Sequence, residues 1–259
     1  MSRLAAVLAG VALLVSAGCG DGGPNAQDVL KQTAANIGKI RSGTLGVHFL
    51  VTPHGGGAPF GFDLTGPFTF RTGKLPLARL VYTQIANGQR ASATLVSTPT
   101  AAYIDAGGAK RPLSADEEQA LRRATAQIAG AGGIGSIVVG DWLTHTKASS
   151  DGNGTDKVTA ELDVAKAADG LLSAARLAGQ NVHELTQADE KRLEDAVRSS
   201  SFVLYSGAKD RLLRELDMSI DFAFDVPRDL RAALGSLAGA KVDFRLKVNR
   251  PNQPVKIAG

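Results

Sequence analysis

The sequence predicts an α+β protein in which a large curved antiparallel β-sheet packs several α-helices against one face. Between Leu216 and Val226, apolar residues occupy every second position and alternate with mostly polar ones, and residues 241–248 repeat this pattern. Because successive side chains of a strand point to opposite faces, both segments are expected to be strands with one apolar and one solvated face. Strands are followed by helices twice along the chain. We interpret the two halves as one sheet, since neither half alone offers enough apolar surface for a core.

Residues 1–18 are predicted to be a signal peptide for export. A basic start that contains Arg3 precedes the apolar run from Leu4 to Val15, and small residues follow it. The run is too short to cross a bilayer, which takes about 20 residues. Glycine and polar residues then predict a flexible tether over 19–26, ahead of a single domain over 27–259.

Cys19 is the only cysteine of the chain, and it follows Ala17 and Gly18. This arrangement resembles the bacterial lipobox, in which the cysteine receives a diacylglyceryl group, although Ser16 stands where the motif usually has leucine. A free thiol would be out of place in an oxidising exported compartment, and acylation removes it. We therefore predict lipidation at Cys19 and anchoring to the outer face of the cell membrane. The alternative is an ordinary signal peptide with an incidental cysteine.

The composition argues against binding to nucleic acid. Loss of the signal peptide removes Arg3 and no acidic residue, so the mature net charge is (29 − 1) − 25 = +3. Basic and acidic residues are interspersed, and aromatic residues make up 5% of the chain. This leaves neither a basic footprint nor a stacking platform for bases.

The first half of the mature chain is predicted to be one helix followed by a meander of strands. Helical spacing of apolar residues covers 27–40, and alternation predicts the strands 45–51, 60–64, 68–70, 79–86, 91–98 and 101–105. Gly66–Pro67 separates the second strand from the third. Asn87–Gly88 is a strong signal for a hairpin turn.

The second half repeats the pattern with more helix. Ser114 and Glu117 match a capping box at the start of a helix that runs to about Ala129. Further helices are predicted over 165–178, over 187–199 and after Pro227, whose position suits the first turn of a helix. Strands are predicted over 157–164, 202–206, 212–226 and 241–248.

No motif points to catalysis, to a metal or to a cofactor. Residues 130–135 match G-x-G-x-x-G, but a helical pattern precedes them and β-branched residues follow, which is the reverse of a dinucleotide site. We interpret them as a mobile loop. The four histidines are scattered, so no zinc site is expected. Asp217, Asp221 and Asp225 lie on the solvated face of a strand and are interpreted as solubilising side chains.

The order of elements behind a lipobox resembles the LolA-like half-barrel lipoproteins of actinobacteria, the LppX and LprG group. The matching pieces are Gly43 at the opening of the first strand, Asp141-Trp142-Leu143, residues 210–224 and the ending 248–259. The resemblance implies a strongly bent sheet that wraps helices around an apolar cavity for lipid acyl chains. The implied cavity lining is Phe49, Phe62, Phe70, Met218, Ile220, Phe222, Phe224, Phe244 and Leu246.

The function expected from this resemblance is binding and transport, without catalysis. The protein would shelter the acyl chains of an envelope lipid or lipoglycan, held to the membrane through Cys19 and working with an envelope transporter. The alternating faces by themselves fit an ordinary packed core equally well. A non-catalytic structural or interaction lipoprotein with a filled core is therefore the alternative, and a hydrolase is a distant third.

Overall fold

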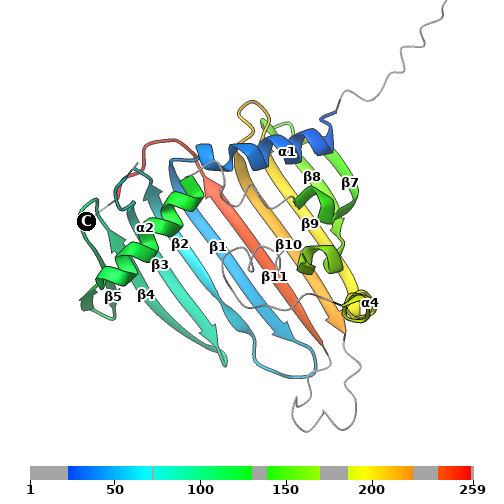
Figure 1. The fold of residues 1–259 in the computed structure, drawn as a ribbon, viewed down its shortest axis with the longest axis horizontal. Helices are drawn as coiled ribbons and strands as arrows, with labels where there is room; N and C mark the ends of the chain where they lie inside the picture. Colours follow the sequence, from blue (N-terminus) through cyan, green and yellow to red (C-terminus); the bar gives the residue numbers. More distant parts are fainter. Residues whose placement is uncertain (1–22, 72, 130–138, 170–185, 224–238, 258–259) are drawn as a thin grey trace, which may run out of the picture.

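An open, twisted antiparallel sheet of 11 strands forms the body of the protein (Figure 1). The computed structural model describes residues 23–71, 73–129, 139–169, 186–223 and 239–257. The strand order is β6-β5-β4-β3-β2-β1-β11-β10-β9-β8-β7, so that β6 and β7 are the two edges. The predicted α+β class and the predicted single antiparallel sheet are confirmed.

The strands are β1 (Ser42–Pro53), β2 (Phe60–Thr69), β3 (Leu77–Ala86), β4 (Gln89–Ser97), β5 (Ala102–Ala106), β6 (Ala109–Pro112), β7 (Leu143–Ser150), β8 (Thr155–Leu162), β9 (Val197–Gly207), β10 (Leu213–Ala223) and β11 (Gly239–Asn249). The helices are α1 (Ala26–Asn36), α2 (Ala115–Ala129) and α4 (Gln187–Ala196), with short 3-10 turns η1 (Ile37–Lys39) and η3 (Val139–Trp142). Residues 164–169 are also helical.

Pairing of β1 with β11 joins the two halves of the chain. Their register runs without a break from Thr44 opposite Asn249 to Pro53 opposite Ala240. The strand that opens the sheet in sequence therefore lies beside the strand that closes it. This pairing joins the meander β1–β6 to the strands β7–β11 in a single sheet.

Two local predictions are confirmed in detail. Asn87 and Gly88 both have positive φ, 52° and 72°, as the two-residue turn between β3 and β4 requires. At the start of α2, the Ser114 amide donates to Glu117 Oε2 at 2.7 Å, and the Glu117 amide donates to Ser114 Oγ at 3.3 Å. This reciprocal pair is the predicted capping box.

The predicted break at Gly66–Pro67 is wrong, because β2 runs through it. Pro67 pairs with Thr44 on the β1 side, while the pairing with β3 stops at Thr65 and resumes at Phe68. A proline has no N–H to give to a ladder, so it fits where one neighbour is locally unpaired. The irregularity is thus a local gap in the pairing with β3, and the register is the same on both sides of it.

One other boundary and two whole strands differ from the prediction. The helix expected over 187–199 ends at Ala196, and β9 begins at Val197. Strands β6 and β7 were not predicted, because both are polar edge strands with little buried surface. The glycine-rich segment 130–135, most of the helix 165–178 and the helix after Pro227 lie outside the described residues.

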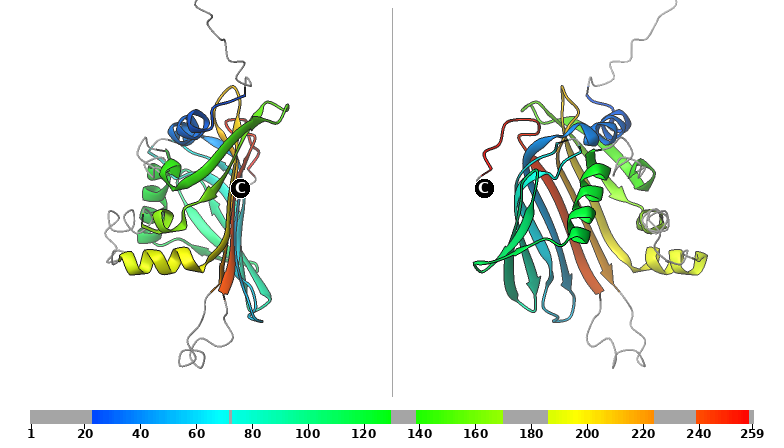
Figure 2. Two further views of the ribbon diagram at one scale, coloured as in Figure 1. Left: turned by 90° about the vertical axis from the view of Figure 1, so that its right-hand side faces the viewer. Right: turned by 60° about the vertical axis from the view of Figure 1, so that its left-hand side comes forward.

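The helices α1, α2 and α4 lie on one face of the sheet (Figure 2). Helix α1 crosses one end of the sheet and contacts β7, β8, β9 and β10. Its Val29 and Leu30 are buried in a core with Phe202, Leu204 and Val248. Within the described chain, no helix is both long and apolar enough to cross a membrane.

Buried polar contacts fix α1 to the sheet. Thr33 of α1 and Ser206 of β9 share a hydrogen bond of 2.6 Å between two buried hydroxyls. Arg211, which pairs with the buried carboxylate of Asp156 in β8, also donates to Gln32 of α1 at 3.2 Å. Removing either partner of such a contact would leave a buried polar group unsatisfied, which costs about 1–3 kcal/mol. The position of α1 is therefore well determined.

The turn after β11 closes the same end of the sheet. Asn252 accepts a hydrogen bond from the Arg41 amide at 2.7 Å and donates one to the Lys39 carbonyl at 3.0 Å. The Asn252 amide also donates to the Ser42 carbonyl at 2.8 Å. One asparagine thereby links the turn after α1, the start of β1 and the end of the last strand.

Candidate functional site: the apolar face of the sheet

The register of the central strands brings most of the predicted lining residues together. Phe49 of β1 lies opposite Phe62 of β2 on one side and Phe244 of β11 on the other. Phe244 in turn lies opposite Met218 of β10. Directly opposed residues share a face of the sheet, so these four side chains form one row across four strands.

A second set of apolar residues flanks this row on the same face. Leu246 lies between Val47 and Leu216 in the neighbouring row, while Ile220 and Phe222 continue β10 on the other side. Together with the central row they form what we call the apolar face: Phe49, Phe62, Met218, Ile220, Phe222, Phe244 and Leu246. All of them are only half-buried.

The apolar face differs from the fully buried core beside it. Under α1, Val29, Val158 and Phe202 are at most 2% exposed. Away from α1, toward β2 and β3, exposure rises until Phe60 is 50% and Tyr82 is 40% exposed. The covered side of the sheet therefore has a filled part and a part whose apolar side chains still reach solvent.

Aromatic rings run continuously across the more open part. The ring centroids of Phe49 and Phe62 are 5.7 Å apart, and those of Phe62 and Tyr82 are 5.8 Å apart. Phe60 begins the same strand two residues before Phe62 and therefore faces the same way. Tyr82 and Phe60 were not among the predicted lining residues, although their place in the alternation of β3 and β2 was a usable signal.

Two predicted lining residues stand apart from the apolar face. Phe70 lies just beyond the end of β2, half-buried, with its ring centroid 4.9 Å from that of the buried Phe68. It packs against the same core as Met218, Ile220, Phe222 and Leu246. Phe224 lies outside the described residues, as do Cys19 and Asp225.

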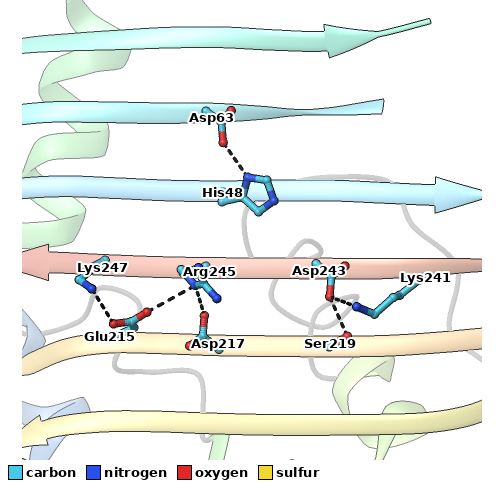
Figure 3. Close-up of polar contacts among 9 residues, drawn as sticks. All are labelled: His48, Asp63, Glu215, Asp217, Ser219, Lys241, Asp243, Arg245 and Lys247. Atoms are coloured by element: carbon cyan, nitrogen blue, oxygen red, sulfur yellow. Dashed lines mark hydrogen bonds and ion pairs between the residues drawn. The ribbon is translucent and has the colours of Figure 1, made fainter. Parts of the chain in front are cut away.

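The opposite face of the sheet carries ordered charge (Figure 3). Glu215 accepts from Lys247 at 2.9 Å and lies 3.4 Å from Arg245, which also pairs with Asp217. His48 lies 2.6 Å from Asp63, and His54 of the β1–β2 turn lies 2.8 Å from Asp221. Asp217 and Asp221 thus belong to ion pairs on a solvated face.

Hydrogen bonds between the charged side chains shift the pKa values of two groups on this face. Burial would raise the pKa of the Asp243 carboxyl, but hydrogen bonds from Lys241 and Ser219 outweigh it and hold that pKa below its ordinary value. The hydrogen bond to Asp217 raises the pKa of Arg245. Both groups therefore stay charged at neutral pH. In the part of the chain that the structure describes, no three His, Cys, Asp or Glu side chains are grouped to hold a metal ion.

Comparisons with known proteins add likenesses of fold. No protein-family model matches the chain, and no curated protein matches it. The chain is similar to the crystal structure of LprF from Mycobacterium bovis, with 16% identity over 92% of this chain and 99% of that chain, at a TM-score of 0.44. It is also similar to a LolA superfamily protein from Nitrosomonas europaea, with 10% identity over 89% of this chain and 96% of that chain, at a TM-score of 0.23.

Proposed function

We propose that this protein is a lipid-binding lipoprotein of the cell envelope that holds acyl chains against the apolar face. In this proposal residues 1–18 are removed, Cys19 carries a lipid that anchors the protein to the outer face of the cell membrane, and 27–259 act as one domain. The cargo is an envelope lipid or lipoglycan, carried across the aqueous space outside the membrane toward a partner such as an envelope transporter.

The half-burial of the apolar face carries this proposal. Seven apolar side chains from four adjacent strands are kept partly open on the side of the sheet where the helices lie. Each CH₂ group that leaves water for an apolar environment gains about 0.8 kcal/mol. A long acyl chain laid across this face would therefore be stabilised by many small, non-directional contributions, and its transfer from a membrane would cost little. No bond needs to be made or broken, so binding rather than catalysis is proposed.

The alternative is an interaction lipoprotein without lipid cargo. It is favoured by one observation, which is that Phe60 and Tyr82 expose aromatic surface at the rim of the apolar face. Such side chains also suit a protein partner. The two functions differ in whether the interior of the purified protein contains lipid.

Native mass spectrometry with organic extraction tests the proposal. Residues 20–259 retain every described residue and lack Cys19, so any lipid that co-purifies from a mycolate-bearing host is held by the fold. We expect a discrete bound species in the parent protein and in Leu50→Lys, and its loss in Phe49→Lys. Phe49 and Leu50 are adjacent in β1 and point to opposite faces. The two variants therefore introduce the same charged side chain into the same strand and differ in the face that receives it.

The controls separate loss of cargo from loss of fold. Circular dichroism and thermal unfolding should show that both variants are folded. A parent protein without extractable lipid, or equal lipid in Phe49→Lys and Leu50→Lys, would overturn the proposal in favour of the interaction lipoprotein.

A further inference from the structure

Among the described residues, basic side chains gather at one end of the sheet, and helix α4 at the other end is acidic. At the end crossed by α1, the connections before β1, between β2 and β3, between β7 and β8 and between β9 and β10, together with the turn 250–253 after β11, contain seven basic and two acidic residues: Lys39, Arg41, Arg71, Lys74, Lys209, Arg211 and Arg250 against Asp151 and Asp210. At the other end, α4 carries Asp189, Glu190, Glu194 and Asp195 against Lys191 and Arg192 (Figure 1). The mild net charge of the chain conceals this separation.

Many of the cations at the α1 end are free. Lys39, Arg71, Lys74, Lys209 and Arg250 are exposed, and among the described residues none of them forms an ion pair. The two acidic residues are already engaged, since Asp210 pairs with Arg214 at 2.7 Å and Asp151 accepts from the Thr155 hydroxyl at 2.5 Å. We call these five cations the basic end.

The basic end is also where the chain enters the fold. Residues 23–25 lead directly into α1, whose N-terminal residue is capped by Asn25. A lipid on Cys19 would lie only a few residues upstream of this helix. An anchored protein is therefore held close to the bilayer by the same end that presents the free cations.

From this coincidence we propose that the basic end docks on an anionic lipid bilayer surface. The occupant is a layer of anionic headgroups, because five cations spread over separate connections match a diffuse negative surface better than a single small anion. The strands then run away from the bilayer, with α4 at the far end. Docking would hold the apolar face upright beside the membrane from which the proposed cargo comes. Both the orientation and the choice of a bilayer rest on the lipid anchor at Cys19 in the proposed function, whereas the free cations do not.

Electrostatics give the expected strength. Each Lys or Arg near an anionic membrane surface adds about five-fold to binding, and salt screens the effect within a Debye length of about 10 Å at 0.1 M. Neutralising three cations should weaken binding on the order of 100-fold. The lysines 39, 74 and 209 come from three different connections and form no ion pair in the described chain, so their removal should leave the fold unchanged.

Vesicle flotation tests the inference. Residues 20–259 are mixed with vesicles of phosphatidylglycerol and phosphatidylcholine (30:70), or of phosphatidylcholine alone, across a series of salt concentrations. We expect binding to the anionic vesicles that weakens with salt, a loss on the order of 100-fold in the K39Q/K74Q/K209Q variant, and nearly parental binding in K110Q/K147Q/K191Q. The control removes the same charge from β6, β7 and α4, away from the basic end.

Equal binding to both kinds of vesicle, or equal loss in the two triple variants, would overturn the docking surface. The extraction experiment separates this result from failure of the proposed function. K39Q/K74Q/K209Q should keep its bound lipid and lose vesicle binding, whereas Phe49→Lys should lose the lipid and keep vesicle binding.

Discussion

At the scale of single residues, the helix-capping residue Glu117 is held in its ionised form by its hydrogen-bond partners. Arg111 donates two hydrogen bonds of 2.8 Å to the Glu117 carboxylate, and the Ser114 amide donates a third. These hydrogen bonds, those from Arg111 above all, lower the pKa of Glu117 from 4.5 to about 2. Ser114 and Glu117 were recognisable in the sequence. The part played by Arg111 was not, because it belongs to a strand that the sequence did not reveal.

We expect the Glu117 carboxyl to titrate near pH 2 in ¹³C NMR spectra of the folded protein. Because the pKa in the folded state lies below the unfolded value, the ionised cap stabilises the fold above about pH 4.5, and this contribution disappears as the pH falls toward 2. The free energy of unfolding of Glu117→Gln should therefore depend less on pH in this window than that of the parent. A Glu117 midpoint near 4.5 in the folded protein would contradict this account of the cap.

At the scale of elements, strands with one buried face were predictable and edge strands were not. The alternation in β10 and β11 is strict, because their apolar side chains face the helices while the others form the ion pairs of the solvated face. Strand β7 has almost no buried residue besides Leu143, so pairing with β8 determines it rather than its own pattern. The end of α4 was misplaced for a similar reason. Residues 197–199 are mixed in character, and pairing with β10 draws Val197 and Ser199 into β9.

The close approach of β2 to β3 at Gly66 predicts a contrast between two glycines. Gly66 has a φ of +151°, and a Cβ there would lie 2.0 Å from the carbonyl oxygen of Arg79 in the neighbouring strand. Gly88 has a φ of +72° in the β3–β4 turn, with nothing within 4 Å of its Cβ position. Alanine at Gly66 must displace backbone as well as strain it, whereas alanine at Gly88 is only strained.

We expect Gly66→Ala to lower the free energy of unfolding by about 3 kcal/mol or more, and Gly88→Ala by about 1 kcal/mol. Urea denaturation of the two variants beside the parent protein measures the difference. If both substitutions cost the same, the close approach of β2 to β3 at Gly66 would be disproved.

At the scale of the whole molecule, the fold gathers residues that are mixed along the sequence into three separate surfaces. The apolar face, the opposite face with its ion pairs (the ion-paired face) and the basic end each combine residues from segments far apart in the chain. Alternation indicated which residues would share a face, and the resemblance noted in the sequence implied that Phe49, Phe62 and Phe244 line a cavity there. It could not show which parts of that face the helices fill, because this depends on where α1 crosses the sheet. Phe70, which was expected in the lining, is half-buried and packs against the buried core, and its place in the lining stays a prediction.

The basic end was hidden for the same physical reason. Its cations are single residues in short connections, separated by strands whose charges belong to other surfaces. Only the antiparallel order brings these connections to one edge of the molecule. Basic residues that are spread evenly along the chain can thus come together at one end of the folded protein.

Photo-cross-linking of a bound acyl chain tests the central claim most directly. A fatty acid with a diazirine in mid-chain is added to residues 20–259, irradiated, and its attachment sites are mapped by mass spectrometry of peptides. We predict adducts on the apolar face in β1, β2, β10 and β11, centred on Phe49, Phe62 and Phe244 and reduced by Phe49→Lys but not by Leu50→Lys. Adducts spread over the ion-paired face, or unchanged by Phe49→Lys, would contradict the assignment of this face as the lipid-binding site.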